Sequence, residues 1–339
     1  SLVGRVQDIQ FDGNRIFVFD GDNEILQVFD GNGKHLCRIG SKGRGPGEYN
    51  SMHDFALDRK DKQVWVHDDA GRKLEVYDYD GRHVMTSPIF YCFSALVFNG
   101  DKVFTLTRSG ENGHIPNFDK HQITATGRDF VPKWGILSND PNPYAGRFSL
   151  FNSDRIKICG SGIAYVDVIS PDTLWYSDGS HVERLLAFTN SKRGKGFSKD
   201  DVKKLTLDNY YKHLDENNIC NIGGFSVSKD FVYAAVRIGN KSKNVLYCRR
   251  TGHFANQNTH GDLKDGRTRL YRKLWSGLTV DYTDGEKFYK VLQPYNLVSF
   301  RNFYTDEEYA RLPEDERRMF KAFKEEDNPI LLVLKFREF

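Results

Sequence analysis

The sequence predicts an all-β protein built from repeated antiparallel units, and three features carry this prediction. Aromatic residues make up 14% of the 339 residues, and they favour strands because flat side chains pack well on a pleated surface. The chain holds 30 glycines, as a fold with many tight turns requires. The third feature is an internal repeat, which occupies the first two units of the chain.

The repeat becomes visible when the sequence is shifted by 48 residues, which aligns residues 15–20 with residues 63–68. The same shift superimposes five identical pairs, namely Leu26/Leu74, Val28/Val76, Asp30/Asp78, Gly33/Gly81 and His35/His83. A period in the forties is the signature of a supersecondary unit that recurs along the chain.

Each unit is predicted to contain four strands. In the first unit the strands lie near residues 9–11, 16–19, 25–29 and 35–39, and Gly, Asn and Asp separate them. These residues tolerate the positive φ of hairpin turns. Further units begin near Ala95, Arg147 and Gly224, and the last ends with residues 330–336. Six units of four strands predict a six-bladed β-propeller, formed as a single domain by residues 1–339. We expect residues 2–6 to close the ring by pairing in the same blade as residues 330–336.

Two segments interrupt the strand pattern and predict short helical insertions. Residues 198–217 begin with Ser198, a suitable N-cap, and continue with apolar residues at helical spacing. Residues 305–326 begin with a capping-box pattern at Thr305. Pro313 lies inside this second segment and predicts two short helices in place of one.

Composition and charge narrow the class of protein. The net charge is +3, with the two signs well mixed along the chain, so nothing predicts a nucleic-acid partner. No apolar run approaches the ~18 residues of a membrane-spanning helix. The five cysteines are scattered and form no C-x-x-C pair, which argues against a zinc site and a dense disulfide framework, although one disulfide remains open. We expect a monomer.

The most distinctive local motif is the glycine-rich segment of residues 40–49, which links the first two units. Its backbone N–H groups could hold an anion. Alternatively, it forms a tight crossing between blades that an ion pair of Arg44 with Glu48 closes. We expect both charged residues near the mouth of the channel, beside His53. The segment matches neither the phosphate-binding nor the dinucleotide-binding glycine pattern.

Three stretches resemble a bacterial six-bladed β-propeller family related to NHL repeats. They are residues 39–49, the matched strand ends at Asp30 and Asp78, and the closing residues 328–336. The resemblance covers essentially the whole chain. It implies an exported protein, either periplasmic or an outer-membrane-anchored lipoprotein whose signal has been removed. It implies no catalytic residues.

Other candidate binding residues lie at predicted strand starts and connections. His53 and Asp54 begin an inner strand, where they could bind a metal or transfer protons, or could simply be a polar pair at the channel mouth. Tyr91, Arg147 and Tyr295 lie where a ligand could stack, although packing or exposure at the surface explains each equally well.

The sequence predicts no catalytic site and no metal or other cofactor. Acidic residues cluster in the first two predicted inner strands, at Asp8 and Asp54, so they would surround a metal poorly. The interpretation is therefore a non-catalytic propeller of the bacterial cell envelope that binds a small molecule or an envelope protein, or acts as a scaffold. The alternative is a metal-dependent hydrolase or lyase that holds Ca²⁺ in the central channel.

Overall fold

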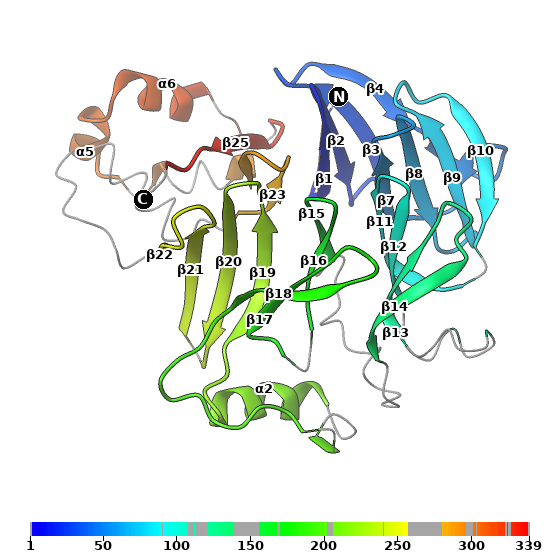
Figure 1. The fold of residues 1–339 in the computed structure, drawn as a ribbon. Helices are drawn as coiled ribbons and strands as arrows, with labels where there is room; N and C mark the ends of the chain where they lie inside the picture. Colours follow the sequence, from blue (N-terminus) through cyan, green and yellow to red (C-terminus); the bar gives the residue numbers. More distant parts are fainter. Residues whose placement is uncertain are drawn as a thin grey trace.

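The computed structural model describes most of the chain. The described residues are 2–89, 91–107, 112, 115, 121–138, 156–167, 170–198, 200–201, 206–239, 241–256, 280–295, 301–302, 304–322, 324 and 327–337. Within them the chain folds into six small antiparallel sheets arranged in a ring, which is a six-bladed β-propeller (Figure 1). The predicted fold class is confirmed.

The first three blades each contain four strands in chain order. Blade one consists of β1 (Val6–Asp12), β2 (Arg15–Asp20), β3 (Ile25–Asp30) and β4 (His35–Ile39). Blade two consists of β7 (Met52–Asp58), β8 (Gln63–Asp68), β9 (Lys73–Asp78) and β10 (His83–Pro88). Blade three consists of β11 (Phe93–Asn99), β12 (Lys102–Thr107), β13 (His121–Thr126) and β14 (Pro132–Ser138). A two-stranded parallel pair, β5 (Ser41–Lys42) and β6 (Glu48–Tyr49), lies between the first two blades.

The remaining blades follow the same plan, with one strand fewer described in the last. Blade four consists of β15 (Ile156–Cys159), β16 (Gly162–Val166), β17 (Thr173–Ser177) and β18 (Val182–Ala187). Blade five consists of β19 (Asn221–Val227), β20 (Phe231–Ile238), β21 (Lys241–Cys248) and β22 (Phe254–Asn256). Blade six consists of β23 (Tyr282–Thr283), β24 (Phe288–Leu292) and β25 (Ile330–Leu334).

The first strand of every blade lies nearest the axis, and these strands form a closed ring of contacts. β1 contacts β7 and β7 contacts β11. The series of contacts continues through β15, β19 and β23 and returns to β1. Blades one and four therefore lie across the axis from each other, as do blades two and five. This order decides which residues, far apart in sequence, face one another in the channel.

The ring closes differently from the prediction. Val6 pairs with Asp20 inside blade one, whereas Ile330 pairs with Leu292 inside blade six, so the two chain ends lie in different blades. Packing between the blades makes the closure instead, because the rings of Phe11 and Tyr289 stack with centroids 4.2 Å apart. The entering chain is held to blade one by a hydrogen bond from the Gly4 N–H to the Asp20 carboxylate. It also contacts blade six, because the Val3 N–H donates to Asn328 Oδ1 over 2.7 Å.

The identical residues of the repeat form identical hairpins. The Asp30 Oδ1 atom accepts hydrogen bonds from the N–H groups of Asn32 and Lys34. Asp78 does the same for the residues two and four positions further on. The glycine of each turn has positive φ, 83° at Gly33 and 84° at Gly81, a conformation that glycine adopts without strain.

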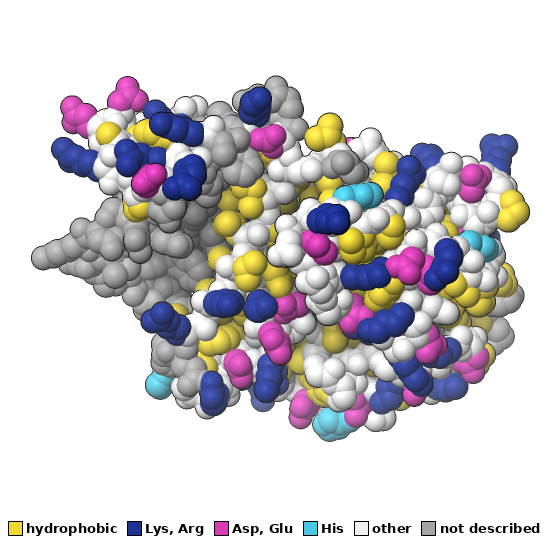
Figure 2. All heavy atoms as spheres, turned by 90° about the horizontal axis from the view of Figure 1, so that it is seen from above, with side chains coloured by type: hydrophobic (Ala, Val, Ile, Leu, Met, Phe, Trp, Pro, Cys, Tyr) yellow, Lys and Arg dark blue, Asp and Glu magenta, His cyan; other side chains and the backbone are white. Residues whose placement is uncertain are grey.

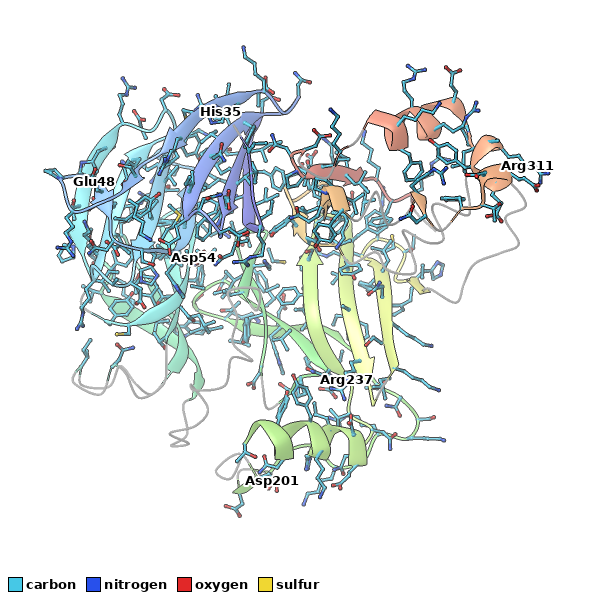
Figure 3. The ribbon with its side chains drawn as sticks, turned by 180° about the vertical axis from the view of Figure 1, so that it is seen from behind. His35, Glu48, Asp54, Asp201, Arg237 and Arg311 are labelled. Atoms are coloured by element: carbon cyan, nitrogen blue, oxygen red, sulfur yellow. The ribbon has the colours of Figure 1, made fainter. Side chains whose placement is uncertain are left out.

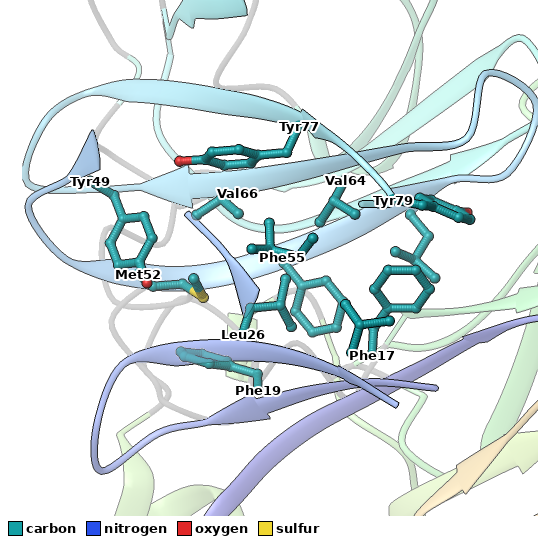
Figure 4. Packing of buried hydrophobic residues seen from close by; sticks show 13 residues of the cluster. Phe17, Phe19, Leu26, Tyr49, Met52, Phe55, Val64, Val66, Tyr77 and Tyr79 are labelled. Carbon is teal, nitrogen blue, oxygen red and sulfur yellow. The ribbon is translucent and has the colours of Figure 1, made fainter. Parts of the chain in front are cut away.

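Apolar side chains from facing blades form the core. Figure 4 shows Phe17 and Leu26 of blade one packed toward Phe55 and Val64 of blade two, and all four are at most 1% exposed. Burying each such side chain contributes roughly 1.5–3 kcal/mol relative to exposure. The core is thus divided into layers between blades, as the alternating pattern of the strands requires.

The helices α2, α5 and α6 lie within the two predicted insertions. Ser198 caps a first turn, where its Oγ atom accepts a hydrogen bond from the Asp201 N–H. Thr206 then caps α2 (Leu207–Glu216). The second insertion contains α5 (Asp306–Ala310), capped by Thr305, and α6 (Glu314–Ala322). Pro313 separates these two helices. Figure 1 shows α2 below the ring of sheets and α5 with α6 at the upper left, to the side of β25.

Two further expectations concern cysteines and membrane helices. The five cysteines are all described, and each is a free thiol. Among the described residues, no helix has the length and hydrophobicity needed to cross a membrane.

Candidate binding site in the central channel

The inner strands share an irregularity that places side chains at the axis. In β1, β7, β11 and β19 the pairing register shifts near the start of the strand, leaving one extra residue at Gln7, His53, Ser94 and Gly223. Such β-bulges bend a strand and re-aim the side chains that follow. The residues that follow these bulges are therefore equivalent, and they are Asp8, Asp54, Ala95 and Gly224.

A cavity of about 350 Å³ occupies the centre of the ring. All six inner strands contribute to its wall. Its polar lining includes Asp8, Gln10, Asp54, Lys157 and Ser226, while alanine and valine side chains from β7 and β11 supply the apolar part. Cavities that bind small molecules in proteins have this size and this combination of apolar wall and few polar groups.

Asp54 is the most strongly perturbed of these groups. Its side chain is buried, and burial raises the pKa of the carboxyl well above its usual range. The negative charge of Asp8 raises the pKa further, whereas hydrogen bonds from the Phe55 and Leu96 N–H groups and the charge of Lys157 act in the opposite direction. The bond from Leu96 also ties blade two to blade three.

Gln10 links the first two inner strands through its side-chain amide. The Nε2 atom donates to the Phe55 carbonyl over 2.8 Å and to Asp8 Oδ2 over 3.1 Å, and Oε1 accepts from the Leu57 N–H over 3.1 Å. The inner edge of β7 faces the axis, so these bonds satisfy backbone groups that would otherwise need water. Gln10 was not predicted from the sequence, although it lies two residues after Asp8 on the same strand.

Ser226 contributes a hydroxyl that has no hydrogen-bond partner among the described residues. The residue is 1% exposed and lines the cavity from β19. Buried polar groups are nearly always hydrogen-bonded, so this hydroxyl can take a water or a ligand atom as its partner. Nothing in the sequence distinguishes this serine from others in strands.

The glycine-rich segment lies away from this cavity, contrary to the expectation. The Tyr77 hydroxyl donates to the Gly47 carbonyl over 2.8 Å, and a Cβ atom at Gly47 would come within 2.7 Å of the His83 ring. Both partners belong to the outer strands β9 and β10. Figure 3 shows Glu48 at the periphery and Asp54 deeper in the molecule. The Glu48 backbone carbonyl also accepts a bond from Lys73 Nζ over 2.6 Å.

The loop is closed by its own carboxylate. Glu48 Oε2 accepts a hydrogen bond from the Gly45 N–H over 2.7 Å, and Ser41 Oγ lies 3.5 Å from Oε1. A Cβ atom at Gly43 would come within 2.0 Å of the same carboxylate. Glu48 thus takes the position proposed for an external anion. Arg44 is exposed and borders a shallow hollow with Lys42 and Lys73.

The other predicted residues are dispersed. His53 is half-buried and packs edge-on against His67, with ring centroids 5.3 Å apart. Tyr91 is buried between blades two and three, and burial raises the pKa of its hydroxyl to about 12. Tyr295 is 60% exposed. Arg147 lies outside the described residues. Of the predicted binding residues that the structure describes, Asp54 lines the cavity, and Asp8, which was expected on the neighbouring inner strand, lines it too.

The described residues contain no group of three or more His, Cys, Asp or Glu side chains placed to hold a metal ion. The wall of the cavity instead combines three carboxylates, one ammonium and one guanidinium group, two side-chain amides and three hydroxyls. This arrangement is suited to binding a polar molecule by complementary hydrogen bonds and charges.

The fold and the channel define a β-propeller with a polar central cavity. Residues 1–335 match the model of the domain of unknown function DUF4934. The chain therefore belongs to the DUF4934 family. No curated protein sequence matches it.

Two solved structures are similar to this chain, and the first shares its fold. One, from Bacteroides fragilis, is described as a putative exported protein; it is 17% identical, with a TM-score of 0.75 over 100% of this chain and 92% of that one. The other, a DUF4221 family member from Bacteroides vulgatus, is 10% identical, with a TM-score of 0.48 over 75% of this chain and 82% of that one. The expected relation to NHL repeats stays a prediction.

Proposed function

We propose that this propeller is a non-catalytic binding protein of the bacterial cell envelope that takes a small polar ligand in its central channel. The observation that carries the proposal is the cavity at the axis, where polar side chains from all six blades line one space. Ligand pockets that bury most of a small molecule have this form. The placement in the envelope rests on the similar fold of the Bacteroides fragilis protein that is described as a putative exported protein.

The surface is less favourable to a large charged partner. On the face shown in Figure 2, Lys and Arg side chains are interspersed with Asp and Glu side chains over the blades. A partner recognised by charge would require one sign to dominate a face. The channel therefore supports a binding function more directly than this face does.

The test is a screen for binding of small polar metabolites by ligand-observed NMR, followed by obstruction of the channel. Val97 lines the cavity from β11, so Val97→Trp fills the cavity and should abolish binding. Val131→Trp is the matched control, because Val131 is 55% exposed and is not part of the cavity wall. Thermal unfolding establishes that both variants fold.

Binding that Val97→Trp leaves intact would contradict the proposal. Binding should also persist in EDTA. Loss of binding on chelation, restored by Ca²⁺, would instead favour a metal-dependent hydrolase or lyase.

A further inference from the structure

The outer edge of blade six differs from that of the other blades. Within the described residues β25 pairs with β24 and with no further strand, whereas each of the other five blades has four strands in its sheet. The side chains of Ile330 and Leu332 pack toward the helical insertion, and Leu331 packs toward blade one. Val333 is 52% exposed. An apolar strand at the edge of a sheet is a template on which another strand can pair.

The seam between blades one and two shows what the fourth strand of a blade does. Ile39 of β4 belongs to the same apolar cluster as Val64 and Tyr77 of blade two, and both of these residues are at most 1% exposed. A Cβ atom at Gly81, in the outer hairpin of blade two, would come within 2.5 Å of the Arg38 carbonyl oxygen of β4. The fourth strand of blade one therefore covers the outer part of blade two.

Blade one lacks the equivalent cover. The 48-residue repeat makes Ile16, Phe29 and Gly33 the counterparts of the three covered residues of blade two. Ile16 and Phe29 are only half-buried, and no described atom lies within 4 Å of a Cβ atom placed at Gly33. In a closed ring the strand that covers blade one belongs to blade six. The exposure of these residues therefore matches the open edge at β25.

A groove of about 630 Å³ lies at this place. Its walls include Phe29 from blade one and Leu331 and Val333 from blade six. The groove continues outward from the packed part of the same seam, where the rings of Phe11 and Tyr289 stack. An extended chain in the groove would lengthen the sheet of blade six and would turn every second side chain toward blade one.

We propose that β25 binds an extended strand of another polypeptide, which becomes the fourth strand of blade six and covers blade one. The strand β4 indicates the chemistry of this partner, because its five residues run antiparallel to β3 and bury Ile39 while Leu36 and Arg38 stay exposed. The partner segment is therefore extended, with an apolar side chain at every second position. Main-chain hydrogen bonds to β25 supply affinity, and the apolar groove supplies selectivity. This inference does not depend on the channel ligand.

A peptide that copies β4 tests the proposal. The probe comprises residues 33–40 with Cys37→Val and carries a fluorescent label, and its binding to the chain of residues 1–339 is followed by fluorescence anisotropy. The control peptide carries Cys37→Asp and Ile39→Asp, which place carboxylates on the side of the strand that enters the groove. We expect the probe to bind about tenfold or more tightly than the control, because an apolar groove does not solvate a carboxylate.

Two variants of the protein locate the binding site. Val333→Glu introduces a charge at the edge of β25 and should weaken binding of the probe about tenfold or more. Val84→Glu is the matched control, because Val84 is 48% exposed on β10, the outer strand of blade two, and this variant should leave the affinity unchanged. Thermal unfolding establishes that both variants fold. Hydrogen exchange gives a second measurement, since the probe should slow exchange of the β25 amides and leave those of β10 unchanged.

Three results would overturn the proposal. The first is a probe that does not bind, or that binds no more tightly than the control peptide. The second is binding that Val333→Glu leaves intact. The third is a dimer of the protein in analytical ultracentrifugation that Val333→Glu dissociates, because the strand at β25 would then come from a second copy of this chain. Val97→Trp should leave binding of the probe unchanged, so failure of the channel proposal and failure of this one are distinguishable.

Discussion

Asp20 and Asp68 occupy the same position in blades one and two, and each carboxylate binds the backbone of the segment that leads into its own blade. Asp20 Oδ2 accepts from the Gly4 N–H and Asp68 Oδ2 from the Asn50 N–H, both over 2.8 Å. Both aspartates are fully buried. The repeated sequence therefore also repeats the buried aspartate that hydrogen-bonds the segment entering each blade.

Removing the Asp68 carboxylate should destabilise the fold. Asp68→Ala leaves the N–H groups of Asn50, Ser51 and Gly71 without their acceptor. We expect a loss of about 2–4 kcal/mol in the free energy of unfolding, measured by urea denaturation. Asp22→Ala is the control, because its ion pair with Arg5 is exposed and should cost about 1 kcal/mol or less. Equal losses in the two variants would show that Asp68 has no such role.

Arg128 connects blade three to blade two through a buried carboxylate. It lies in the turn between β13 and β14 and forms two hydrogen bonds with Asp58, which is 1% exposed. Arg128→Met leaves that charge unpaired and should cost about 2–3 kcal/mol, after allowance for the partial exposure of the guanidinium. Adding Asp58→Asn should recover part of the loss in a double-mutant cycle. Strictly additive losses would argue against the pairing.

Position 47 requires glycine for two reasons, namely its backbone conformation and the side chain packed against it. Its φ is 71°, and a Cβ atom would come within 2.7 Å of the His83 ring. Gly47→Ala should therefore cost more than Gly13→Ala, where φ is 57° but no atom lies within 4 Å of the added Cβ. We expect about 1 kcal/mol at Gly13 from strain alone and about 2–3 kcal/mol at Gly47, from chemical denaturation. Similar costs would mean that the loop relaxes.

The raised pKa of Asp54 predicts how the stability of the fold changes with pH. The folded state holds this proton more tightly than the unfolded state, in which the pKa lies near 3.8. The stabilisation from Asp54 is therefore full below 3.8 and is lost as the pH rises through the folded-state pKa. Relative to the wild type, Asp54→Asn should gain stability across this window, as urea denaturation at successive pH values would show.

The pKa of Asp178 is shifted in the opposite direction to that of Asp54. Hydrogen bonds from the Ser180 and His181 N–H groups lower the pKa of its carboxyl to about 2. Its stabilisation is present above 3.8 and is lost as the pH falls toward 2, so Asp178→Asn should lose stability relative to the wild type as the pH rises through that range. A constant difference between Asp54→Asn and wild type at all pH values would contradict the assignment for Asp54.

Features that depend on neighbouring residues were predictable without the structure. The Asp30 and Asp78 hairpins, the capping box at Thr305 and the break at Pro313 each involve residues within a few positions of one another. Their hydrogen bonds form wherever the local sequence is correct, so the pattern indicates them directly. The six-bladed fold followed from the repetition of such units.

The position of the glycine-rich loop could not be predicted in the same way. The sequence shows that residues 40–49 form an unusual connection, but Tyr77 and His83 decide where it packs. Both lie about thirty or more positions further on in the chain. Connectivity between two strands leaves many paths open, and packing selects one of them.

The sequence by itself determined the strands of the blades, the hairpin turns, the number of blades and the caps at Ser198 and Thr305, because short-range hydrogen bonds and alternating burial specify them. The cap of α2 at Thr206 was not predicted. Only the tertiary structure decided how the ring closes and what faces the axis. Asp8, Asp54, Lys157 and Ser226 come from four blades and meet at one cavity. The order of the blades around the axis decides which of these residues face each other. They are far apart in the sequence and become neighbours only when the ring closes, so no local sequence pattern predicts their distance.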